Sequence, residues 1–278
     1  MAHRDPRGRG SVGAGIVLEL GARADASFTP GPRSQVRVES GDPGPWPISL
    51  EVASRLAPDR PGTLTVRLSH ELPVGQGFGM SAAGALATAL AVGSLAGRPR
   101  SQSIAVAHLA DLFGGGGLGG VAAILGGGLE IRTRPGVPPL GRVMHRPFRP
   151  PLLVGVVGAP IPSPSILRDP TALRRIVDAS KGWDRLTRSP TLKRFLGVSE
   201  RFTDRVGLST PLVERAVSAL RDRDAWACQA MFGQSFFARP RSTEAREQCI
   251  DWLARHGVRA VEVRAARFGA RLQRPSVG

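Results

Sequence analysis

The stretch Glu71–Gly97, ELPVGQGFGMSAAGALATALAVGSLAG, joins a glycine-rich loop to a long run of alanine and leucine. Glycine adopts positive φ angles and lets the backbone approach a ligand closely. The start of a helix adds unpaired N–H donors and the positive end of the helix dipole. The sequence therefore predicts a helix from Ser81 to about Leu95 with an anion-binding loop at its start. The alternative is a tight turn in which Ser81 is an ordinary N-cap.

Three known glycine motifs do not match this loop. A dinucleotide-binding fingerprint requires G-x-G-x-x-G, and Met80 stands where its last glycine should be. A Walker loop requires a lysine beside the hydroxyl residue, and the loop has none. A nucleophile elbow requires G-x-S-x-G, and Ala83 stands at its last position. The arrangement that remains, a strand, a glycine-rich turn, a serine and a helix, is suited to holding phosphate groups.

The pattern around the loop predicts an α+β fold. Alternating apolar residues in TLTVRLSHELP, residues 63–73, indicate a half-buried strand that leads into the loop. Strands are expected at 11–20, 22–28, 34–39, 128–134, 141–146 and 152–161, with strand-like tails at 258–265 and 270–273. Helices are expected at 101–113, from about 121, and at 165–180, 189–206, 211–222, 224–237 and 243–256. Little regular βαβ alternation occurs, so a doubly wound sheet is disfavoured.

Composition narrows the possible partners and location. The formal charge of +16 could attract nucleic acid, but almost all of the 38 basic residues are arginines, and they are scattered along the chain. We therefore expect no nucleic-acid partner. The sequence has no apolar run long enough for a membrane span and no signal core after its basic start. Cys228 and Cys249 fit no metal spacing, which favours a reduced, cytoplasmic protein.

Several segments, in order along the chain, carry a resemblance to one enzyme family. LPVGQGFGMSAAGALATALA, residues 72–91, resembles the phosphate-binding motif P-x-x-x-G-x-G-S-S-A-A of the GHMP kinases. DPRGRGSVGAGIVLELG, residues 5–21, and GGGGLGGVAAILGGGLEIRTRPGVPPLGRV, residues 114–143, resemble two further segments of the archaeal pantoate kinase branch. GAPIPSPSIL, RFTDRVGL and ACQAMFGQSFFA follow in the expected order. The resemblance implies the two-domain GHMP kinase fold, with a ribosomal-S5-like N-terminal domain at 1–148 that is expected to lack its first strand, and a C-terminal domain at 149–278.

The resemblance also implies a reaction and a set of site residues. Pantoate kinases transfer the γ-phosphoryl group of ATP to a hydroxyl group of pantoate in coenzyme A biosynthesis. By similarity, Ser81 and Asp111 would hold Mg²⁺ and carry the catalytic chemistry, and Met231, Gly233 and Gln234 would lie near the nucleotide. The residues expected to wrap the ATP phosphates are Gly75, Gly77, Phe78, Gly79, Met80, Ser81, Ala82 and Ala83. Those expected to bind the pantoate carboxylate or line its pocket are Arg9, Ser11, Gly13, Gly15 and Arg132.

Two departures from the family pattern keep other hypotheses open. Gly120 stands where the family often has an acidic residue that activates the substrate hydroxyl or orients the metal. Family members also begin further upstream, with a P-G-H-like motif, so we expect that Met1 is a misassigned start or that the chain is a truncated paralogue. The alternatives are another GHMP-type small-molecule kinase and a catalytically impaired nucleotide-binding protein of the same fold. A homodimer is possible in this family.

Overall fold

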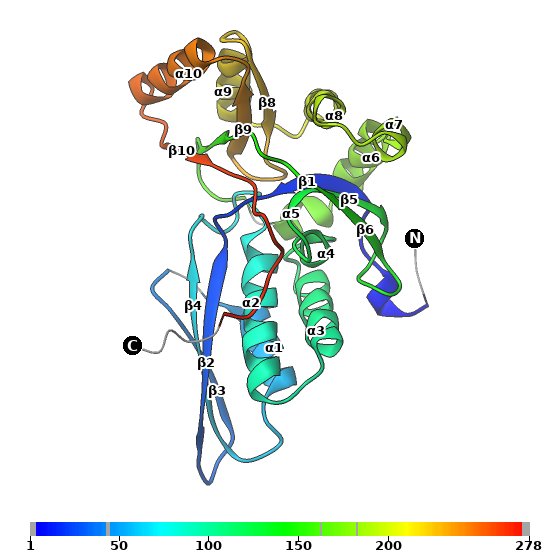
Figure 1. The fold of residues 1–278 in the computed structure, drawn as a ribbon, viewed down its shortest axis with the longest axis vertical. Coiled ribbons are helices and arrows are strands. Elements are labelled where there is room, and N and C mark those ends of the chain that lie inside the picture. The colour runs from blue at the N-terminus through cyan, green and yellow to red at the C-terminus, as the bar shows by residue number, and fades with distance from the viewer. Residues whose placement is uncertain (1–3, 43–44, 162, 182, 274–278) are drawn as a thin grey trace. The chain divides into compact units, whose positions relative to one another are not determined.

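A computed structural model describes residues 4–42, 45–161, 163–181 and 183–273. Met1, on which the expectation about the start codon depends, lies outside these residues. The expected α+β class is confirmed (Figure 1). The elements are η1 Pro6–Gly8, β1 Gly13–Val17, β2 Ala22–Pro30, β3 Gln35–Ser40, α1 Pro47–Leu56, β4 Gly62–His70, α2 Met80–Leu95, α3 Arg100–Phe113, α4 Gly120–Ala123, β5 Gly128–Arg134, β6 Arg142–Arg146, β7 Leu152–Val156, α5 Ser163–Leu167, α6 Pro170–Ala179, α7 Asp184–Arg188, α8 Leu192–Val206, α9 Pro211–Arg221, β8 Ala225–Gln229, β9 Ser235–Pro240, α10 Thr243–Arg255 and β10 Ala260–Val263.

The chain forms two compact units. The first unit comprises Met1–Leu72, Gly79–His145 and Ala266–Gly278, and the second comprises Pro73–Phe78 and Arg146–Ala265. The glycine loop is therefore divided, because the chain passes from the second unit to the first between Phe78 and Gly79. The division into domains at 1–148 and 149–278 stays a prediction about the family's domains.

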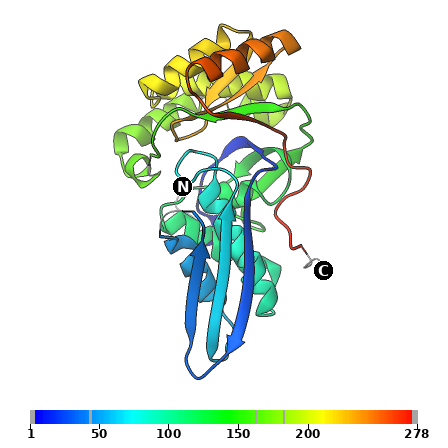
Figure 2. The same cartoon turned by 90° about the vertical axis from the view of Figure 1, so that its left-hand side faces the viewer.

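The first unit packs helices onto one face of a sheet. β4 is the central strand, antiparallel to β2 and parallel to β3 (Figure 2). Leu64, Val66 and Leu68 alternate along β4 with more exposed residues, so the buried side of the sheet meets α1 and α2. The helix α2 is apolar on all sides, and this explains why it lies inside the unit rather than on its surface. A second sheet in the same unit has the order β1-β5-β6.

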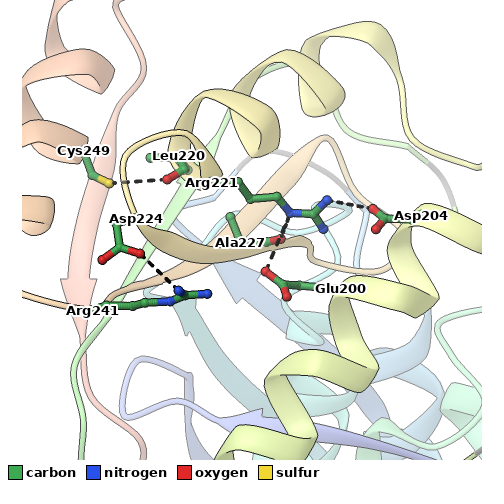
Figure 3. Close-up of polar contacts among 8 residues, drawn as sticks. All are labelled: Glu200, Asp204, Leu220, Arg221, Asp224, Ala227, Arg241 and Cys249. Atoms are coloured by element: carbon green, nitrogen blue, oxygen red, sulfur yellow. Dashed lines mark hydrogen bonds and ion pairs between the residues drawn. The ribbon is translucent and has the colours of Figure 1, made fainter.

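The second unit contains a sheet of order β10-β7-β9-β8, packed against α9 and α10. Arg221 at the end of α9 donates to the carbonyl oxygen of Ala227 on β8 at 3.0 Å and to Asp204 on α8 at 2.8 Å (Figure 3). The same guanidinium lies 3.8 Å from Glu200. Because three elements share one guanidinium, these contacts hold α8 and α9 against the edge strand β8.

Some sequence-based expectations for secondary structure are wrong. Residues 224–237 form no helix; they belong to the hairpin of β8 and β9, in which Trp226 and Phe236 supply bulky side chains that favour strands. The helix α1 begins at Pro47 and continues through residues 48–56, for which the sequence pattern predicted no element. Residues 270–273 form no strand. No helix in the described part of the chain is long and apolar enough to cross a membrane.

Candidate active site

The start of α2 is an uncapped helix N-terminus. Gly79 is the N-cap, has a φ of 72°, and no side chain caps the helix. The interpretation of Ser81 as an N-cap is therefore wrong. A Cβ atom at Gly79 would meet nothing within 4 Å, whereas the Met80 side chain is buried. Backbone N–H groups of the first turn are thus the donors that this end of α2 offers to an anion.

Ser81 and Asp111 form a hydrogen-bonded pair between α2 and α3. The Ser81 hydroxyl donates to Oδ1 of Asp111 over 2.9 Å, and only 2% of Asp111 is exposed. Burial raises the pKa of Asp111 to about 7, while the hydrogen bond from Ser81 acts in the opposite direction. Asp111 is therefore not a solvated residue on the helix surface. The two residues that sequence reasoning assigned to a metal lie together.

Glycines surround this pair. A Cβ atom at Gly116 would overlap both the Asp111 carboxylate and the Ser81 hydroxyl. At Gly120, a Cβ atom would lie 3.9 Å from Oδ2 of Asp111 and 2.5 Å from the Cβ of Ala82. Position 120 therefore borders on Asp111, and Ala82 fills the space that a side chain at position 120 would need.

A second polar group lies where β1 pairs with β5. Arg132 faces Gly13 across the two strands, and a Cβ atom at Gly13 would overlap Nη2 of Arg132. Nη1 of Arg132 donates to Oε1 of Glu130 at 2.7 Å and to the carbonyl oxygen of Gly119 at 3.4 Å. The hydroxyl of Ser11 and Nε of Arg132 both border on Gly119, since a Cβ atom there would lie about 3 Å from each.

The Ser81–Asp111 pair and the Arg132 group approach each other at two consecutive glycines: Gly119, the N-cap of α4, and Gly120, its first residue. Gly119 borders on Arg132, and Gly120 borders on Asp111. Consecutive Cα atoms are about 3.8 Å apart, so a small molecule that contacts both glycines reaches both groups. The structure thus brings Ser11, Gly13, Ser81, Asp111 and Arg132 into one region of the first unit.

The earlier part of the glycine loop belongs to the second unit and is held by its own contacts. The Gln76 side-chain amide donates to the carbonyl oxygen of Gly158 at 2.8 Å, and the backbone carbonyl oxygen of Gln76 accepts a hydrogen bond from the hydroxyl of Ser235. A Cβ atom at Gly77 would overlap the carbonyl of Ala230, and one at Gly233 would overlap the backbone of Gln76. Close backbone packing therefore explains why Gly77 and Gly233 are glycines.

The remaining predicted residues are placed as follows. Gly75 has a φ of 77°, and Phe78 is half-buried. Met231, Gly233 and Gln234 lie in the connection between β8 and β9, where Gln234 bonds the carbonyl oxygen of Ala159. The Arg9 side chain is exposed, and its carbonyl oxygen lies 3.0 Å from Nε2 of His108.

Sequence reasoning missed two buried polar residues of this region. His108 lies one turn before Asp111 on α3 and is 2% exposed. Glu130 is 2% exposed and pairs with Gly15 across the strands. The signal that could have revealed Glu130 is the match between two alternating patterns, glycine at 13 and 15 on β1 and charge at 130 and 132 on β5.

The chain is similar to known proteins over most of its length. Residues 48–128 match the model of the GHMP kinases N terminal domain. The pantoate kinase of Thermococcus kodakarensis is 30% identical over 252 residues, which are 88% of this chain and 84% of that protein. The chain belongs to the GHMP kinase family. The expected family resemblance is thereby confirmed.

A further relative and two solved structures are similar to this GHMP kinase in sequence or in fold. The pantoate kinase of Methanospirillum hungatei JF-1 is 29% identical over 246 residues, covering 86% of this chain and 81% of that protein. A solved structure described as a phosphotransferase related to the CoA biosynthesis pathway has a TM-score of 0.83 at 27% identity, covering 96% and 93% of the two chains. A mevalonate kinase from L. major, in complex with R-mevalonate, shares the fold at a TM-score of 0.65 and 15% identity, covering 94% and 91%.

Proposed function

We propose that this GHMP kinase transfers the γ-phosphoryl group of ATP to a hydroxyl group of pantoate, giving 4-phosphopantoate for coenzyme A biosynthesis. The relatives named pantoate kinase match most of the chain. The observation that carries the proposal is the arrangement around Gly119 and Gly120. It brings a hydroxyl–carboxylate pair for phosphate chemistry close to a buried arginine for a small carboxylate.

The phosphate end of the site is the start of α2. The open backbone at Gly79 and the unpaired N–H groups of Met80, Ser81 and Ala82 would surround the ATP phosphates. The reaction requires mainly positioning and charge neutralisation of the transferring group. By similarity to the family motif, Gly75, Gly77 and Phe78 would belong to the same phosphate-binding loop, and Ala83 continues the first turn of α2.

The residues present fit a magnesium ion delivered with the nucleotide. Mg²⁺ prefers oxygen ligands and is often bound by one or two carboxylates together with phosphate oxygens and water. Ser81 Oγ and the Asp111 carboxylate supply such oxygens, whereas no group of three or more His, Cys, Asp or Glu in the described residues forms a separate metal site. The ion would neutralise phosphate charge. Ser81 and Asp111 would hold it through their adjacent oxygens.

The acceptor end of the site is Arg132. A guanidinium binds a carboxylate through a planar fork of two N–H groups. Nε and Nη2 of Arg132 form no hydrogen bond to a described residue, so this edge of the guanidinium, beside Gly13 and Gly119, would donate to the carboxylate of pantoate. Ser11 and Gly13 would line this end, with Arg9 at its rim.

The substrate hydroxyl has no acidic residue at position 120 to receive its proton. Phosphoryl transfer passes through a loose transition state in most analyses, so the attacking oxygen loses its proton late and positioning carries most of the catalysis. A positioned general base contributes about 10²–10⁴-fold to the rate of other reactions. Because this chain has glycine rather than an acid at position 120, we infer that its turnover is slower than that of a homologous kinase with an acid there.

The test is ADP release from ATP and Mg²⁺ in the presence of D-pantoate, compared with mevalonate and homoserine under the same conditions. Pantoate-dependent turnover supports the proposal. Turnover only with mevalonate or homoserine would show that the protein is a kinase whose substrate is that alcohol rather than pantoate.

A second candidate function is a catalytically impaired nucleotide-binding protein, favoured by Gly120 and by the Ala82 side chain beside it. ATP binding without turnover of any acceptor would support this candidate. We further propose a cytoplasmic location, to which the two buried free cysteines lend support. The homodimer that the family allows and the absence of a nucleic-acid partner stay predictions.

A further inference from the structure

Glu130 and Arg132 project from the same face of β5 because side chains two residues apart in a strand share a face. Across the ladder they face Gly15 and Gly13 of β1. A Cβ atom at Gly15 would lie 3.1 Å from Oε1 of Glu130, and one at Gly13 would overlap Arg132. The two glycines therefore make room for a pair of charged side chains on one face of this sheet.

The pair is buried but its hydrogen bonds are incomplete. The side chains of Arg132 and Glu130 are 14% and 3% exposed. Oε1 of Glu130 accepts a hydrogen bond from Arg132, whereas Oε2 of Glu130 and Nε of Arg132 are buried without a hydrogen-bond partner in the described chain. Buried polar atoms that lack partners are rare in folded proteins, because leaving them unpaired costs free energy. The ion pair therefore offers a ligand one buried acceptor, Oε2 of Glu130, and one buried donor, Nε of Arg132.

We propose that Glu130 makes the site selective for acids that carry a hydroxyl group beside the carboxylate, its Oε2 accepting a hydrogen bond from that hydroxyl while Arg132 binds the carboxylate. The inference rests on the proposed function, in which Arg132 binds pantoate. The hydroxyl concerned is the one on the carbon next to the carboxylate, which does not receive the phosphoryl group.

The chemistry of the pair suits this role. A hydroxyl group needs an acceptor for its proton, and a carboxylate oxygen is a strong acceptor. Arg132 is the charged group in contact with Glu130, and the facing positions on β1 carry no side chain. The buried carboxylate would otherwise be left with one unpaired oxygen, and burial raises the pKa of Glu130 to about 7. A hydrogen bond from the substrate hydroxyl replaces one of the hydrogen bonds from water that Glu130 loses on burial.

A different role for Glu130 would be to hold Arg132 in place and nothing more. Such a positioning residue affects every substrate that has a carboxylate, whether or not a hydroxyl group lies beside it. A residue that binds the hydroxyl affects only the hydroxy acid. The two roles therefore differ in how the effect of a Glu130 substitution depends on the substrate.

The experiment measures kcat/KM with D-pantoate and with 4-hydroxy-3,3-dimethylbutanoate, which lacks the hydroxyl beside the carboxylate. The proteins are the wild type, Glu130→Ala, Glu130→Gln and the control Glu39→Gln. Glu39 is an exposed acid on β3 and lies 3.6 Å from Arg67, so the control removes one negative charge elsewhere in the same unit. We expect removal of the substrate hydroxyl to lower kcat/KM about tenfold or more in the wild type and the control, and less than about threefold in Glu130→Ala.

The outcomes separate the two proposals. An equal loss in the wild type and Glu130→Ala would overturn the role of Glu130 and leave pantoate kinase activity standing. A wild type that does not phosphorylate pantoate would overturn the proposed function itself. If Glu130→Ala does not fold, Glu130→Gln decides. Its amide keeps the shape of the side chain but loses the charge, so the tenfold discrimination should fall to about threefold, and unchanged discrimination would refute the inference.

Discussion

The hydroxyl of Ser81 donates a hydrogen bond of 2.9 Å to Asp111, a carboxylate thirty positions further along the chain and almost wholly buried. The helices α2 and α3 pack side by side and hold the two groups at the open start of α2. A buried carboxylate beside a hydroxyl is costly unless it binds a cation or a proton. The pair is therefore the feature of the first unit that most strongly indicates phosphate chemistry.

We expect Ser81→Ala and Asp111→Ala each to lower turnover by about tenfold or more, since each removes an oxygen that would hold the metal or the phosphates. Steady-state ADP release measures the effect. Ser94→Ala, an exposed serine near the other end of α2, is the matched control and should leave turnover unchanged. Wild-type rates for both site variants would show that the assignment of the site is wrong.

Replacing Gly79 by alanine should weaken ATP binding. Gly79 and Gly97 flank the two ends of α2, both have a positive φ, and a Cβ atom at either would meet nothing within 4 Å. Gly79→Ala and Gly97→Ala should thus lose similar stability, about 1–2 kcal/mol, through backbone strain. Only Gly79→Ala should raise the KM for ATP, because only that glycine lies at the start of the helix. Equal KM values in the two variants would argue against phosphate binding there.

Adding a methyl group at position 120 should destabilise the protein. A Cβ atom at Gly120 would lie 2.5 Å from Cβ of Ala82, so Gly120→Ala should lower the free energy of unfolding by about 1–3 kcal/mol. Urea denaturation measures this change. Ala82→Gly combined with Gly120→Ala should recover part of the loss, and Gly21→Ala, where nothing lies within 4 Å, should cost less. A stable single variant would mean that α4 can move away from α2.

Arg132→Lys should raise the KM for pantoate about tenfold or more while the KM for ATP stays near that of the wild type. Lysine carries the charge but lacks the planar fork that binds a carboxylate through two N–H groups. Arg134→Lys, two residues further along the same strand and exposed, is the control. If the two variants behave alike, Arg132 does not bind the carboxylate.

The stability of the protein should depend on the ionisation of Glu130. Burial raises the pKa of Glu130 from 4.5 to about 7 in the folded chain, with Arg132 acting in the opposite direction. Between these pH values the folded chain binds more protons than the unfolded chain, so the free energy of unfolding falls as the pH rises.

Relative to Glu130→Gln, the wild type should therefore lose on the order of 2 kcal/mol of stability between pH 5 and pH 7.5. Urea denaturation of both proteins at the two pH values measures the difference, in which the contribution of Asp111 cancels. A difference that does not change with pH would show that Glu130 titrates normally.

The sequence by itself determined what depends on neighbouring residues and on segments in a fixed order. Alanine and leucine after the glycines predicted α2, alternation predicted β4, and ordered motifs led to the GHMP kinase family. These features are encoded locally or within single segments. The hairpin of β8 and β9 was mistaken for a helix because its apolar residues fit either period until strand pairing selects one.

Only the tertiary structure decided which distant residues meet. The contact of Ser81 with Asp111 depends on how α2 and α3 pack, and the facing of Glu130 and Gly15 depends on the register of β1 and β5. A shift of one residue in that register would turn Glu130 and Arg132 toward the other face relative to their partners. Register and packing depend on the whole buried surface of the unit, so the residues of a single strand do not reveal that Glu130 belongs beside Arg132.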